Sequence, residues 1–94
     1  MTPALIYRTV IYTQRFEEEL AALDPEPRRA DEFVRGAEWV LCRYPLIGTR
    51  IAPNSSVWFI PSTDASTVQP LGIYYAHSQN TVVLLSIEQA ASSP

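Results

Sequence analysis

The sequence predicts an α+β fold with the element order β-α-α-β-β-β, in which a helical hairpin packs as a second layer on a mainly antiparallel four-stranded sheet. Two neighbouring segments in the N-terminal half repeat apolar residues at helical spacing. Segments rich in β-branched and aromatic residues precede and follow them. An antiparallel sheet needs a cover for its apolar face, and the two helices are the elements available to provide it.

Length and composition indicate one domain. The chain has 94 residues, of which 47% are hydrophobic, 11% aromatic and 18% charged. We expect a single domain over 1–94, with an ordered core at about 4–88 and a flexible tail at 89–94. The chain is too short for a (β/α)₈ barrel of roughly 200 residues. It also lacks the run of ~20 apolar residues that would cross a bilayer.

The first strand and the first helix follow each other directly. Residues 5–13 contain β-branched and aromatic residues without Gly or Pro, which is typical of a strand. Thr13 is placed to cap a short helix at 14–23, and the carboxylates at 17–19 suit the first turn of that helix because of its dipole. One apolar stripe follows the helix, formed by Phe16, Leu20 and Leu23.

A second helix is predicted over 25–43. Asp24 and the prolines that follow it break the first helix and can begin the next. Pro45 ends the second helix, and Gly48 favours a turn, so 44–49 is expected to be an exit loop. One face of this helix is marked by Ala30, Phe33, Val34, Ala37, Val40, Leu41 and Tyr44.

The C-terminal half alternates between strand and turn patterns. Strands are predicted at 57–60, 71–76 and 81–87, the last being the most β-prone stretch of the chain. A polar loop at 61–70 separates the first two of them. Residues 77–80 are predicted to form the hairpin loop between the last two.

Charge and cysteine content exclude several classes of function. All seven basic residues are arginines, and from residue 51 onward the only side chain that can carry positive charge is His77. This distribution argues against direct nucleic-acid binding by the C-terminal half. Cys42 is the only cysteine, so one chain cannot form a disulfide or a cysteine-based zinc site. We therefore expect no metal or other cofactor, and a cytoplasmic location without membrane association.

Several local motifs occur in a characteristic order. Residues 7–13 (YRTVIYT) form the strand that precedes 16–23 (FEEELAAL), and 44–50 (YPLIGTR) contain a P-x-x-G exit from the second helix. Residues 73–75 (IYY) and 81–87 (TVVLLSI) form the final hairpin. In this order the segments resemble the first strand, first helix, helix exit and last hairpin of the RelE/ParE superfamily of bacterial type II toxin–antitoxin toxins.

The resemblance implies a toxin-like component that a cognate antitoxin neutralises, in modules associated with plasmid stabilisation. RelE-like members cut messenger RNA in the ribosome, whereas ParE-like members inhibit DNA gyrase. The RelE-like pattern places lysines or arginines on the second and third strands and an arginine, histidine or tyrosine near the C-terminus, where they stabilise the charge of the phosphorane and move protons. Here the aligned segments 57–60, 70–72 and 88–90 contain no basic residue. This difference favours a ParE-like toxin that acts by protein–protein binding, with gyrase as the candidate target.

Two alternatives remain open. One is a ribosome-dependent messenger RNA endoribonuclease with a relocated site, for which Arg50 and His77 are the candidate catalytic residues. The other is a diverged, non-toxic interaction module, for which a homodimer is a candidate assembly. The candidate partner-binding residues are Arg43, Arg50, Trp58 and Tyr75, because arginine and large aromatic residues dominate binding hot spots. Strand register decides which of Tyr74 and Tyr75 faces outward.

Overall fold

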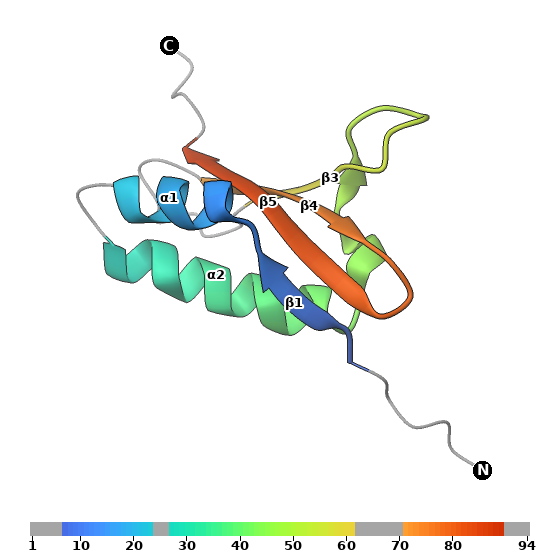
Figure 1. The fold of residues 1–94 in the computed structure, drawn as a ribbon, viewed down its shortest axis with the longest axis horizontal. Coiled ribbons are helices and arrows are strands. Elements are labelled where there is room, and N and C mark those ends of the chain that lie inside the picture. Colours follow the sequence, from blue (N-terminus) through green and yellow to red (C-terminus); the bar gives the residue numbers. More distant parts are fainter. Residues whose placement is uncertain (1–6, 24–26, 62–70, 90–94) are drawn as a thin grey trace.

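A computed structural model describes residues 7–23, 27–61 and 71–89 of the chain. Two helices lie next to each other and cover a sheet whose strands are ordered β1-β5-β4-β3-β2 (Figure 1). The two-layer α+β architecture predicted from the sequence is confirmed. Its elements are β1 (Thr9–Tyr12), α1 (Gln14–Ala22), α2 (Pro27–Leu41), the 3₁₀ turn η1 (Pro45–Ile47), β2 (Thr49–Arg50), β3 (Trp58–Pro61), β4 (Leu71–His77) and β5 (Thr81–Gln89).

The sheet has five strands, one more than predicted. The additional strand, β2, pairs antiparallel with β3 through Thr49↔Phe59 and Arg50↔Trp58. It lies partly within the segment predicted as an exit loop, and two residues are too few to show a β pattern in the sequence. The remaining pairs are antiparallel except for β1 and β5, which run parallel from Thr9↔Thr81 onward.

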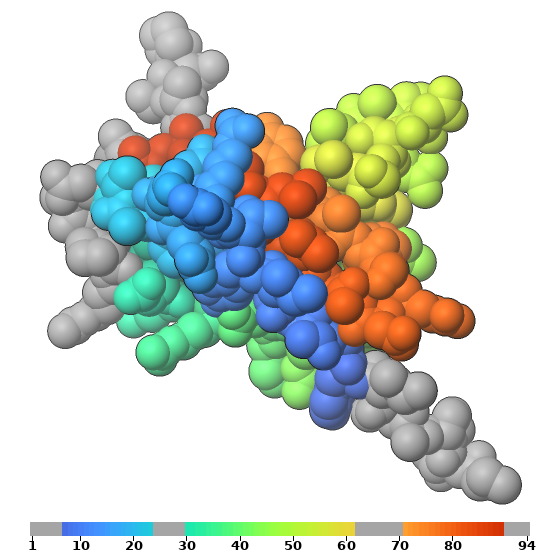
Figure 2. All heavy atoms as spheres, in the orientation of Figure 1, coloured from blue at the N-terminus to red at the C-terminus, as the bar shows by residue number. Residues whose placement is uncertain are grey.

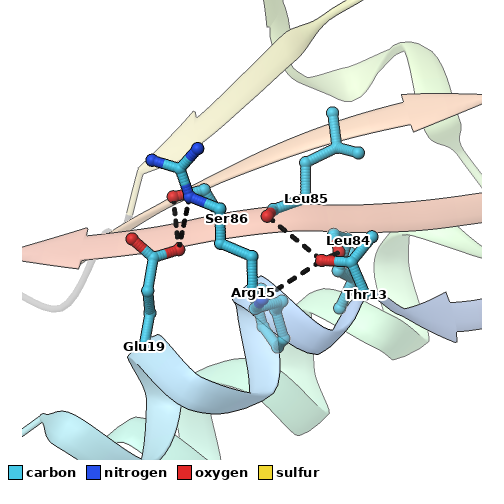
Figure 3. Close-up of polar contacts among 7 residues, drawn as sticks. Thr13, Arg15, Glu19, Leu84, Leu85 and Ser86 are labelled. Atoms are coloured by element: carbon cyan, nitrogen blue, oxygen red, sulfur yellow. Dashed lines mark hydrogen bonds and ion pairs between the residues drawn. The ribbon is translucent and has the colours of Figure 1, made fainter.

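Polar contacts fix α1 against β5 where β1 ends. The Thr13 side chain caps α1 by accepting a hydrogen bond from the Phe16 amide at 3.1 Å, as the sequence predicts. The Thr13 hydroxyl also lies within donating distance of the Leu84 and Leu85 carbonyl oxygens, at 3.0 and 3.2 Å (Figure 3). One turn further along α1, Glu19 accepts a hydrogen bond from the Ser86 hydroxyl at 2.7 Å. These contacts join the first helix to the last strand.

The core lies between the helices and the face of the sheet that they cover. The apolar stripes predicted for the two helices both contribute to it, but Tyr44 does not, because it lies beyond the last turn of α2 and is exposed. The cluster of buried residues consists of Phe16, Val34, Ala37, Leu41, Ile73, Tyr75, Val82, Leu84 and Ile87.

Tyr75 is fully buried in this core, at 0% exposure. Its hydroxyl donates a hydrogen bond to the Pro45 carbonyl oxygen at 2.7 Å and accepts one from the Gly48 amide at 3.1 Å. The selection of Tyr75 as a partner-binding residue is therefore wrong, because its ring and its hydroxyl are both occupied inside the domain. Tyr74 is the partly exposed member of the pair, and its ring lies 5.0 Å from that of Phe59.

Some predicted features fall outside the described residues. The interruption between the helices at 24–26, the polar loop over 62–70 and the final residues 90–94 belong to this group. The last strand continues two residues beyond its predicted end and includes Glu88 and Gln89. Among the described residues, no helix has the length and apolar character needed to cross a membrane.

Candidate functional site

Four side chains gather at the end of the sheet where β4 turns into β5. We call this group, formed by Arg8, Arg50, Trp58 and His77, the histidine cluster. Arg50 and Trp58 are cross-strand partners, and the Arg50 guanidinium carbon lies 5.3 Å from the centre of the Trp58 ring. The ring of Trp58 in turn meets that of His77 edge-on, with their centres 5.3 Å apart. The cluster therefore draws on β2, β3 and β4 together.

Arg8, the residue that precedes β1, is the fourth member of the cluster. Its Nε donates a hydrogen bond to the Ser78 carbonyl oxygen at 2.8 Å, which fixes the guanidinium beside the residue that follows His77. Its backbone amide donates to the Cys42 carbonyl oxygen at 3.0 Å. Two cations from distant parts of the sequence thus approach His77.

His77 is the last residue of β4, where it pairs with Val82, and it is partly buried. The prediction that it belongs to the hairpin loop is wrong by one residue, because β4 pairs with β5 as far as this position. Burial lowers the pKa of His77 below 6.5, and the positive charges of Arg8 and Arg50 lower it further. A histidine that is neutral near pH 7 can accept a proton, and neighbouring arginines can stabilise an anion next to it.

A second group of side chains lies at the end of α2. The Arg43 guanidinium carbon is 4.0 Å from the centre of the Trp39 ring and 4.3 Å from that of Tyr7. Arg43 also donates a hydrogen bond from one terminal nitrogen to the Trp39 carbonyl oxygen at 2.7 Å. Both contacts restrict the rotamers of this side chain, so the guanidinium is held in place between two exposed aromatic rings.

The structure brings together three of the five residues predicted for the site. Arg50, Trp58 and His77 belong to the histidine cluster, whereas Arg43 lies in the second group and Tyr75 in the core beneath them. The centre of the Tyr75 ring lies 6.3 Å from that of the His77 ring, so this core side chain lies close to the histidine cluster.

Arg8, Tyr7 and Trp39 were missed by the sequence reasoning. Arg8 and Tyr7 belong to a segment that reads as a plain strand, and Trp39 is not among the candidate residues of the sequence analysis. The signal that could have pointed to Trp39 is its position outside the apolar stripe of α2. Within residues 7–23, 27–61 and 71–89, no group of three or more His, Cys, Asp or Glu side chains is placed to hold a metal ion.

The helical hairpin, the parallel β1–β5 pair and the antiparallel β5-β4-β3-β2 arrangement form a fold that this chain shares with a solved structure. A chain of the toxin–antitoxin complex RelBE2 from Mycobacterium tuberculosis superposes on this one with a TM-score of 0.71. The match covers 97% of this chain and 100% of that chain at 21% sequence identity, so it shows a shared fold. No protein-family model matches the sequence, and no curated protein matches it significantly. The resemblance drawn from the sequence is confirmed at the level of the fold.

Proposed function

We propose that this chain is the toxin-like component of a type II toxin–antitoxin module and that a cognate antitoxin binds and neutralises it. The observation that carries the proposal is the likeness of fold to a chain of a toxin–antitoxin complex over nearly the whole length of both chains. The small size of the domain also supports the proposal that a partner binds it. A chain of this size buries only about 60–65% of its unfolded surface, so a bound partner would add appreciably to its stability.

We further propose that the toxin acts by protein–protein binding, in the manner of ParE-like members, with DNA gyrase as the candidate target. The strands β3, β4 and β5 contain no lysine or arginine. A binding mechanism tolerates the loss of these cations better than a mechanism that must stabilise a phosphorane.

One observation favours RNA cleavage as a second candidate function. The charges of Arg8 and Arg50 both act on His77, and a neutral histidine beside two guanidinium groups is what a relocated nuclease site requires. In that reaction neutral His77 would accept the proton of a ribose 2′-hydroxyl while its oxygen attacks the adjacent phosphorus. The two guanidinium groups would stabilise the phosphorane, and the 5′-oxygen would leave with a proton from water.

Growth of a bacterial culture tests the toxin–antitoxin assignment. The chain is induced alone and together with the product of the adjacent open reading frame. Arrest that the neighbouring product relieves is the expected result. No arrest at confirmed soluble expression would contradict the assignment and favour the non-toxic interaction module, for which light scattering should then reveal a concentration-dependent homodimer.

Transcript integrity and gyrase supercoiling separate the two modes of action. For a gyrase inhibitor, transcripts stay intact during arrest and purified protein blocks supercoiling. For a nuclease, transcripts are cut, and both Arg50→Ala and His77→Ala abolish cutting. Arg15→Ala is the matched control, because Arg15 is an exposed α1 arginine whose side chain pairs only weakly with Glu19, at 3.6 Å.

A further inference from the structure

Large apolar and aromatic side chains are exposed together around the end of α2. Trp39 is 59% exposed and Leu46 is 67% exposed, although residues of these types are usually covered. Figure 2 shows the segment that leads into β1, in blue, against the green atoms of the α2 exit, so this surface draws on both ends of the described N-terminal half. We call it the arginine–aromatic patch, and it consists of Tyr7, Trp39, Arg43, Tyr44, Leu46 and Ile47.

Positive charge predominates among the described residues in and after this patch. Residues 39–61 contain no Asp or Glu, whereas Arg43 lies within the patch and Arg50 follows it in β2. Glu38, the nearest acid in the sequence, accepts a hydrogen bond from the Tyr12 hydroxyl between α2 and β1. The other described acids lie on α1, on the first half of α2 and at Glu88, near the end of β5 away from the hairpin. The patch therefore presents positive charge beside apolar surface.

We propose that the arginine–aromatic patch is the docking surface for an acidic segment of the antitoxin that also carries apolar side chains. This inference rests on the proposed function and adds to it the place and the chemistry of the contact. Apolar side chains of the segment would pack on Trp39, Leu46 and Ile47, and a carboxylate would meet Arg43. Tryptophan, tyrosine and arginine are the residue types that dominate binding hot spots.

The placement of Arg43 strengthens this assignment. Its guanidinium is already stacked between Tyr7 and Trp39 and hydrogen-bonded to a carbonyl oxygen, so little side-chain entropy is lost when a carboxylate binds. A guanidinium is also suited to bidentate hydrogen bonds with a carboxylate. The arginine is therefore already fixed beside two exposed aromatic rings, where a carboxylate can bind it.

Other occupants fit this patch less well. A second copy docked about a two-fold axis would bring Arg43 against the same six patch residues, none of which supplies a carboxylate for either guanidinium. RNA would use the aromatic rings and the arginine, but it would leave the aliphatic side chains of Leu46 and Ile47 without an apolar partner. An acidic polypeptide segment satisfies both the charge and the aliphatic surface.

Calorimetric titration with the product of the adjacent open reading frame tests the proposal. The variants are Arg43→Glu and Leu46→Glu. Their matched controls are Arg15→Glu on α1 and Ile11→Glu on β1, which reverse or introduce the same charge at exposed positions outside the patch. Circular dichroism and thermal melting confirm that each variant is folded. We expect both patch variants to weaken the affinity on the order of 30-fold and both controls to change it by less than about twofold.

The outcomes distinguish failure of this inference from failure of the proposed function. If the wild-type chain does not bind the neighbouring product, both fail. If the wild type binds and the patch variants bind equally well, or the controls lose as much affinity as the patch variants, only the docking surface is wrong. It is equally overturned if Leu46→Glu abolishes a concentration-dependent dimer, or abolishes binding of single-stranded RNA, without affecting the neighbouring product.

Discussion

Replacing Tyr75 by Phe should destabilise the domain markedly although it removes a single oxygen atom. The Tyr75 hydroxyl joins β4 to the exit of α2 by donating to the Pro45 carbonyl oxygen at 2.7 Å and accepting from the Gly48 amide at 3.1 Å. The ring is 0% exposed, and Pro45 is buried as well. The substitution leaves the Pro45 oxygen buried without this donor, so the desolvation of that group is no longer compensated.

The magnitude follows from these two contacts. Loss of the donor to a buried carbonyl oxygen costs about 1–2 kcal/mol, and loss of the acceptor for the half-buried Gly48 amide about 1 kcal/mol. The free energy of unfolding should therefore fall by roughly 2–3 kcal/mol, which for a domain of this size lowers Tm by about 10–20 °C. Urea and thermal unfolding of the purified protein measure both quantities.

Tyr74→Phe is the matched control for this prediction. Its hydroxyl donates to a Glu88 carboxylate oxygen at 2.9 Å on the surface, where water can replace the contact. Its loss should change the free energy of unfolding by less than about 0.5 kcal/mol. Equal shifts for the two neighbouring tyrosines would refute the reasoning, because the argument attributes the whole difference to burial.

Four further predictions test the helices, a turn and a charge contact. Gly36 lies exposed in α2 with open space where a Cβ would lie, so Gly36→Ala should raise the free energy of unfolding, measured in urea, by roughly 0.5–1 kcal/mol. Gly48→Ala should lower it by about 1–3 kcal/mol, because the new Cβ would lie 2.6 Å from the Phe59 carbonyl oxygen in β3. Thr13→Ala removes the α1 cap and should cost about 1–2 kcal/mol in the same assay, so an unchanged urea midpoint would contradict the capping role. NMR titration should give His77 a pKa below 6.5, and this pKa should rise in Arg50→Ala; an unchanged pKa would contradict the charge contact. Because the His77 pKa is lower in the folded than in the unfolded chain, the unfolded chain binds more protons between the two pKa values. The free energy of unfolding should therefore fall as the pH drops through 6.5 toward the folded pKa, and it should be fully retained above 6.5.

The helices could be predicted because their signals are local. Thr13 caps the first helix within three residues of its own position, and the apolar stripes of both helices repeat every three or four residues. Pro45 ends the second helix for a reason that involves only its neighbours. Each of these features depends on contacts along the chain, so one sequence is enough to identify them.

The face of each strand residue could not be predicted in the same way. Strict alternation places Leu84 and Ile87 on opposite faces, yet both are buried in the core. The pairing of β4 and β5 shifts between Tyr74 and Tyr75, because Tyr74 pairs with Ser86 and Tyr75 with Leu84. This irregularity, a β-bulge, changes which residues of β5 face the core, and no glycine marks its position in the sequence. The choice between the two tyrosines was therefore open in the sequence and is fixed only by pairing.

The histidine cluster was beyond sequence reasoning for a related reason. Its members lie far apart in the chain, and the register of four strand pairs brings them together. Arg50 faces Trp58 only because β2 exists, and β2 consists of two residues. The absence of lysine and arginine from β3 and β4 is visible in the sequence, but the effect of the Arg8 charge on His77 depends on tertiary structure.

The two candidate sites are joined by the backbone, so under the proposed function neutralisation and activity would be linked. Arg8 belongs to the histidine cluster, follows Tyr7 of the arginine–aromatic patch, and donates its amide hydrogen to the carbonyl oxygen of Cys42, next to Arg43. A segment docked on the patch would therefore lie one residue away from the cluster and could cover it. If RNA cleavage is the activity, patch variants that weaken antitoxin binding should still cut transcripts but escape neutralisation. If gyrase binding is the activity, His77→Ala should remain toxic and remain neutralised, because the cluster then takes no part in chemistry.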